Sequence, residues 1–151
     1  MRIYQKFGNT LAVLICIAAF VMCAVLVIKD GVSTVDTDTG VTTYFYEKSD
    51  FQGYLFVALS FLVSAVATSC ATELPMVSAG ISILPLAMTF YQFATGNLFE
   101  IVAAIVLLLA MIHVACNVLA WWDQQADKAK EKALANAEVS AEENVGEQTK
   151  A

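Results

Sequence analysis

The residues of this chain that could do chemistry away from water are few, and they centre on one histidine. His113 lies in the longest apolar run, residues 98–122, and Cys116 and Asn117 follow it at spacings of three and four residues. In a helix these spacings place the three side chains on one face. An ionisable group inside an apolar run is a functional candidate by default, because a charge there is costly. We therefore predict a polar site at this face.

Cys70, near the end of another apolar run, is expected at a depth similar to that of Cys116, so it joins the candidate site. Imidazole and thiolate ligands suit zinc or copper. However, the His-x-x-Cys spacing is not specific, and no Cys-x-x-Cys pair accompanies it. We predict neither a bound metal nor another cofactor.

Three interpretations of His113 stay open. The imidazole could be hydrogen-bonded to a neighbouring helix, which is the ordinary arrangement and the favoured one. It could bind a proton as part of sensing or transport. It could also belong to a metal-linked or thiol-linked site.

Four apolar runs must position these residues. The sequence is 59% hydrophobic and only 15% charged, and nearly all of its charges lie in residues 1–6, 29–50 and 123–150. This composition is outside the range of an ordinary soluble domain. A run of about twenty apolar residues crosses a bilayer as a helix. We predict an all-α integral membrane protein in which residues 1–122 form an up-down bundle of four transmembrane helices, at about residues 9–28, 54–71, 76–93 and 98–122.

Two features inside the predicted spans bear on packing. Ser60, Ser64 and Thr68 recur every four residues, a pattern that favours a helix-packing face; the alternative is a polar pore lining. Pro85 falls in the middle of the third span and predicts a kink there.

The polar segments have their own patterns. Residues 29–52 form a loop with two β-branched and aromatic stretches around Asp-Thr-Asp-Thr-Gly, which predicts a β-hairpin-like structure with Gly40 at positive φ. Ser49 with Gln52, and Asn97 with Glu100, predict capping boxes at the second and fourth helices. Residues 123–151 form a polar tail; its first half predicts helix, and its last dozen acidic residues predict disorder.

Charge predicts the orientation. The formal net charge is −6 and no basic stripe is present, so nucleic acid is not an expected partner. Basic residues near the spans number five on the side of the termini and two on the opposite side. The positive-inside rule then places both termini in the cytoplasm and the hairpin loop outside, in a plasma or inner membrane. The two sets are Arg2, Lys6, Lys128, Lys130 and Lys132, against Lys29 and Lys48.

No nucleophile–base pair and no glycine-rich phosphate loop is visible in the sequence. We therefore predict no catalytic residues and a protein that is not an enzyme. The favoured function is an accessory, scaffold or sensing subunit that acts in the lipid bilayer through a membrane-protein partner or a second copy of itself. The alternative is a small oligomeric transporter or channel that uses His113 and the Ser60, Ser64 and Thr68 face. A membrane enzyme with a thiol or a metal ranks third.

Overall fold

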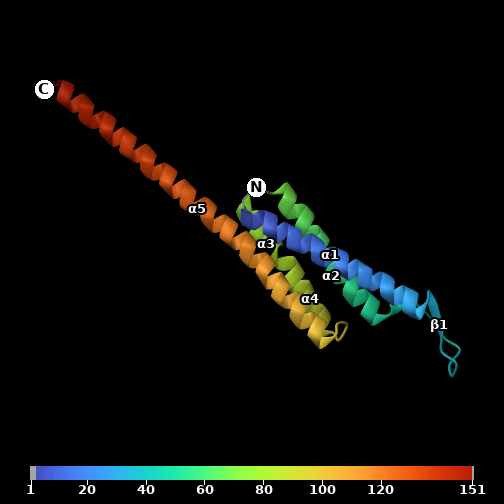
Figure 1. The fold of residues 1–151 in the computed structure, drawn as a ribbon. Coiled ribbons are helices and arrows are strands. Elements are labelled where there is room, and N and C mark those ends of the chain that lie inside the picture. Colours follow the sequence, from blue (N-terminus) through green and yellow to red (C-terminus); the bar gives the residue numbers. More distant parts are fainter. Residues whose placement is uncertain (1–2, 151) are drawn as a thin grey trace.

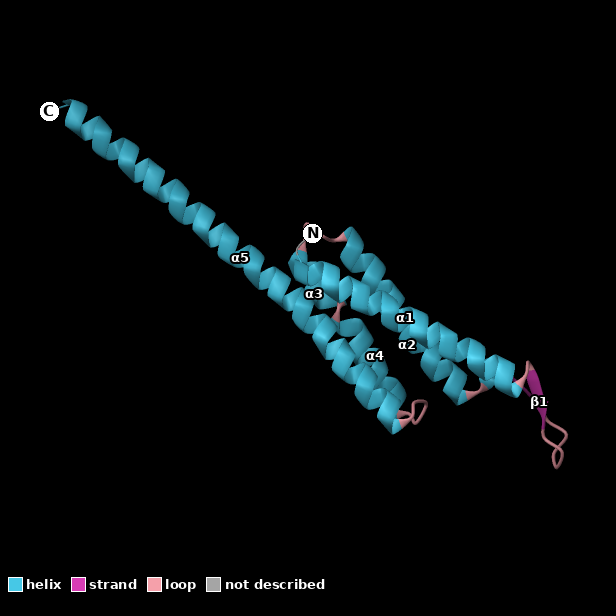
Figure 2. Ribbon diagram, viewed as in Figure 1, coloured by secondary structure: helices cyan, strands magenta, loops and turns pink. Residues whose placement is uncertain are grey.

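The computed structural model describes residues 3–150, and 83% of these residues are helical (Figures 1 and 2). Among them, four helical segments are long and apolar enough to cross a membrane, and we call these segments the spans. They are α1 (Ile3–Asp30), α2 (Ser49–Cys70), α3 with α4 (Pro75–Ile81 and Ile83–Ala94), and α5 (Glu100–Lys150). Between α1 and α2 lie strands β1 (Ser33–Val35) and β2 (Thr42–Tyr44) and the 3-10 turn η1 (Phe45–Glu47).

The spans form a closed ring, because α1 packs on α2, α2 on α3 and α4, these two on α5, and α5 back on α1. Successive spans run in opposite directions, so α2 and α5 run parallel across the diagonal. The hairpin lies at one end of this bundle, and α5 leaves the bundle at the other end, where α1 also begins (Figure 1). We call these the hairpin end and the tail end.

The interior of the bundle combines small apolar residues with polar side chains, whereas many large apolar side chains lie on its outer surface. Alanines fill much of the interior, with Ala12, Ala58 and Ala110 fully buried, and Phe61 is the largest fully buried side chain. Large apolar residues point outward from every span, among them Phe20, Leu62, Phe90 and Leu108. Lipid is as apolar as leucine, so helices in a bilayer associate through close backbone packing and polar contacts rather than through burial of large side chains. This arrangement is consistent with a membrane protein.

The third span is broken as Pro85 predicts. α3 ends at Ile81 and α4 begins at Ile83, with Ser82 between them. Proline lacks the amide hydrogen that would bond to the carbonyl of Ile81, four residues earlier, and its ring crowds that carbonyl. The Ser82 hydroxyl donates to the carbonyl of Ala79 at 2.6 Å, which gives this polar side chain a partner at the break.

The predicted capping boxes differ from the structure. Ser49 is the first residue of α2 and Lys48 precedes it in extended conformation, while the Gln52 amide donates to the carbonyl of Tyr46 at 3.0 Å. Asn97 donates to Gln92 Oε1 at 2.7 Å, and α5 begins three residues later. The Gln52 and Asn97 side chains therefore bond to the chain that precedes each helix instead of completing a capping box.

The tail also differs from its prediction. α5 continues without a break to Lys150, so the last dozen residues are helical rather than disordered. The tail is rich in alanine, glutamate and lysine, which have high helix propensity, and it extends a helix that the bundle has already nucleated. Every side chain from residue 125 to residue 150 is exposed.

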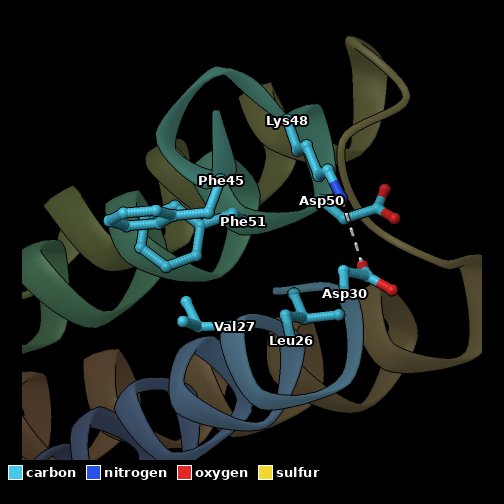
Figure 3. A pocket seen from close by; sticks show the side chains of 7 residues that line it. All are labelled: Leu26, Val27, Asp30, Phe45, Lys48, Asp50 and Phe51. Carbon is cyan, nitrogen blue, oxygen red and sulfur yellow. Dashed lines mark ion pairs between the residues drawn. The ribbon is translucent and has the colours of Figure 1, made fainter. Parts of the chain in front are cut away.

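The hairpin is attached to the bundle by a small contact between the end of α1 and the start of α2 (Figure 3). Phe45 meets Phe51 edge to face with ring centroids 5.0 Å apart, above Leu26 and Val27 of α1. Lys48 and Asp30 form an ion pair at 3.6 Å, with both side chains partly exposed. An exposed pair contributes about 0–1 kcal/mol, so the apolar contact is the main attachment.

The hairpin turn predicts a pH effect that is confined to the loop. Asp36 Oδ1 accepts the backbone N–H of Asp38 at 2.9 Å, and this bond, with further help from Thr39, lowers the pKa of Asp36. A lowered pKa means that the carboxylate stabilises the turn above the ordinary aspartate pKa of about 3.9, and that this stabilisation is lost as the pH falls through the lower value.

We expect the amide resonance of Asp38 to shift in NMR spectra during this acid titration, with weakening of the contact between Thr34 and Thr43, which face each other across the strands. Asp36→Asn is the matched control, because it keeps an acceptor oxygen but does not titrate. Equal shifts of the Asp38 amide resonance in the natural protein and in the Asp36→Asn variant would contradict this interpretation.

Candidate functional site

His113 bridges three helices in the middle of the ring. Its side chain is fully buried. Nδ1 lies 2.9 Å from the carbonyl oxygen of Gly8 on α1, and Nε2 lies 2.8 Å from the hydroxyl of Ser64 on α2. A carbonyl oxygen only accepts, so Nδ1 carries the hydrogen in the neutral ring, and Nε2 then accepts the hydrogen of the Ser64 hydroxyl. Both ring nitrogens therefore have partners, and the imidazole connects α5 to α1 and α2.

Gly8 makes this bridge possible. A Cβ atom built on Gly8 would lie 3.1 Å from Cys116 Cβ and 3.5 Å from His113 Nδ1. The absent side chain lets the backbone of α1 approach α5 closely, as small residues do between helices in membranes. Sequence reasoning missed Gly8, although a glycine within a long helix, where it is intrinsically unfavourable, is a signal of close approach.

A second polar contact lies one helical turn nearer the tail end. The Thr68 hydroxyl donates to Asn9 Oδ1, and the Asn9 amide donates to the Ser69 hydroxyl at 3.0 Å. Asn9 is buried in α1 next to Gly8. It was predicted only as the start of the first span, and its role became visible when α1 was placed against α2. The two contacts together fix how α1 sits on its neighbours.

Cys116 and Asn117 share the inward face of α5 with His113, and both are buried. The Asn117 amide donates to the carbonyl of His113 at 2.9 Å, a bond to its own helix four residues earlier. Asn117 Oδ1 has no protein partner. Cys116 packs against Gly8 where α1 and α5 approach closely.

Cys70 does not belong to this site, which corrects the sequence prediction. Its side chain is exposed. Ser64 is the residue of α2 that meets His113, and Cys70 lies six residues further along, which turns it by about 240° on the helix and carries it about 9 Å past the histidine. Within residues 3–150, no group of three or more histidine, cysteine or acidic side chains could hold a metal ion.

The Ser60, Ser64 and Thr68 face lies inside the bundle, where all three side chains are buried. The Ser60 hydroxyl donates to the carbonyl of Val57 at 2.7 Å, and Ser64 and Thr68 meet His113 and Asn9. The hydroxyls are therefore used within and between helices.

Among residues 3–150, the buried polar side chains include no carboxylate, lysine or arginine. A general acid–base pair or an ion-coupled site normally needs a second ionisable group near the first. What the site offers is one neutral imidazole that holds helices together and could take up a proton. Comparison with known protein families, curated proteins and solved structures found no match for this chain.

Proposed function

We propose that this protein is a non-catalytic membrane protein that acts by association, as an accessory, scaffold or sensing subunit. One observation carries the proposal: α5 continues far beyond the bundle as a single exposed helix (Figure 1). Residues 125–150 make up this extension, and at 1.5 Å per residue it reaches about 39 Å. Isolated helices draw little stability from their own hydrogen bonds, and most gain it by packing on another surface. The expected partner is a membrane-associated protein or a second copy of this chain.

The charge distribution supports an orientation for this proposal. Basic residues cluster at the tail end, which by the positive-inside rule is the cytoplasmic end of a plasma-membrane or inner-membrane protein. In that orientation the helical extension is presented to the cytoplasm and the hairpin to the outside.

The second candidate, a small oligomeric transporter, has less support. It would use His113 with the Ser60, Ser64 and Thr68 face. The hydrogen bonds of these side chains are made to neighbouring helices and to backbone carbonyls. In a transport pathway, polar side chains must exchange such hydrogen bonds for hydrogen bonds to a substrate. The buried oxygen of Asn117, which has no hydrogen-bond partner, favours this candidate.

The proposal is tested by photo-crosslinking in cells that naturally express the protein. A photoreactive phenylalanine analogue is placed at Leu134 or Val139, both exposed on the extension, with Val63, exposed on α2, as the matched lipid-facing control. We expect one adduct of defined mass from the extension and none from Val63. Unmodified monomer at both extension positions would contradict association through this helix.

A further inference from the structure

We propose that His113 is an acid-sensitive latch, whose protonation releases α5 from α1. This inference goes beyond the proposed function, because it concerns how the bundle responds to acid whether or not a partner is bound. It depends on three features: the hydrogen bonds of the imidazole, the absence of a counter-charge around it, and the close contact at Gly8 that it holds together.

The hydrogen bonds fit the neutral imidazole. Nδ1–H donates to the carbonyl of Gly8 and Nε2 accepts from Ser64. A proton added at Nε2 turns that acceptor into a donor, so the ring nitrogen and the serine hydroxyl then present hydrogens to each other. The hydroxyl must rotate away before the contact to α2 can form again.

Within residues 3–150, no helix packed around the imidazole places a buried, negatively charged carboxylate beside it. The buried polar side chains of α1 are the amides of Gln5 and Asn9, and those of α2 are the hydroxyls of Ser60, Ser64 and Thr68, none of which ionises at ordinary pH. Apart from His113, the ionisable side chains buried among residues 3–150 are thiols. These thiols belong to Cys16, Cys23 and Cys116.

The remaining elements do not supply a charge either. The buried polar side chains of α3 and α4 are hydroxyls and one amide, from Ser78, Thr89 and Gln92, with the hydroxyl of Ser82 between the two helices. Lys6, Glu73 and Glu100 are exposed. An unpaired imidazolium in a bundle at membrane depth is strongly unfavourable. Protonation therefore favours an open arrangement of the helices, in which water reaches the imidazolium.

The contact between α1 and α5 is where opening can be detected. Cys116 is only 7% exposed, and it lies directly against Gly8. Separation of α1 from α5 uncovers this thiol. The labelling rate of Cys116 therefore reports how often α1 and α5 separate.

The experiment uses the full chain in phosphatidylcholine vesicles, with Cys16→Ala, Cys23→Ala and Cys70→Ser so that Cys116 is the only thiol. Its reaction rate with N-ethylmaleimide is measured from pH 7.5 to pH 5, with and without His113→Asn. Each rate is divided by its value at pH 7.5. The normalised rate of the chain with His113 is then divided by that of the His113→Asn chain, which removes the pH dependence of the thiol itself. We expect this ratio to rise by up to about tenfold per pH unit below the ordinary histidine pKa of about 6.5. A ratio that stays constant overturns the proposal.

A second measurement needs no change at residue 113. Nitrogen-15 NMR of the histidine ring shows which nitrogen carries hydrogen. We expect the Nδ1–H form at pH 7.5, and an imidazolium signal that grows over the same pH range as the labelling of Cys116. Formation of the imidazolium without increased labelling of Cys116 would also overturn the latch. This measurement decides the matter if the asparagine variant does not fold.

Discussion

Replacing His113 by alanine is expected to lower the free energy of unfolding by about 2–4 kcal/mol. The substitution removes a fully buried ring from the centre of the bundle and leaves the carbonyl of Gly8 and the hydroxyl of Ser64 without their partner. Interhelical hydrogen bonds in membrane proteins average only about 0.6 kcal/mol each. The cavity is therefore the larger part of the loss. Thermal unfolding in detergent micelles measures it.

His113→Asn is the control for this result. Asparagine keeps an N–H that can donate to Gly8 and fills part of the space, so we expect a smaller loss, about 1–2 kcal/mol. An alanine variant as stable as the natural chain would show that the histidine does not hold the helices together.

Gly53→Ala is expected to be the second strongly destabilising change. A Cβ at this position would lie 2.4 Å from the carbonyl oxygen of Asn97 and 3.0 Å from its carbonyl carbon. These are backbone atoms of the turn between α4 and α5, so they cannot rotate away. Either α2 or the turn must shift, which costs about 1–3 kcal/mol, the usual range for overpacking.

The chain supplies a matched control in Gly80, a helical glycine for which an added Cβ meets nothing within 4 Å. Gly80→Ala is expected to leave stability unchanged or to raise it by up to about 1 kcal/mol, because alanine favours the helix. Thermal unfolding of the two variants side by side checks the pair. Equal effects would mean that the close approach at Gly53 is not what makes the difference.

The apolar spans and the break at Pro85 could be predicted from the sequence, since both depend on local composition. The inward face of α5 could also be predicted from the sequence, because His113, Cys116 and Asn117 follow helical spacing. The partners of His113 could not be predicted: Gly8 and Ser64 lie 105 and 49 residues earlier, and nothing local shows which faces of α1 and α2 meet α5. Cys70 was misplaced because depth alone was considered, and depth says nothing about the direction in which a side chain points around its helix.

The starts of α2 and α5 and the structure of the tail differ from their predictions for a related reason. Ser49 and Asn97 match capping patterns, but Ser49 lies inside the helix as its first residue, and the Asn97 side chain bonds to Gln92 of the preceding helix. For the tail, the acidic composition pointed to disorder, whereas continuity with a span supplies the helix nucleus that an isolated segment lacks.

Native mass spectrometry of the protein extracted from its own membranes tests the central claim, association through the helical extension, most directly. The full chain is compared with a chain ending at residue 122, after circular dichroism has shown that the shortened bundle is still helical. We predict that the full chain carries the mass of a partner or of a second copy and that the shortened chain is a monomer. A shortened chain that keeps the same partner, or a full chain that is a monomer, would contradict the account.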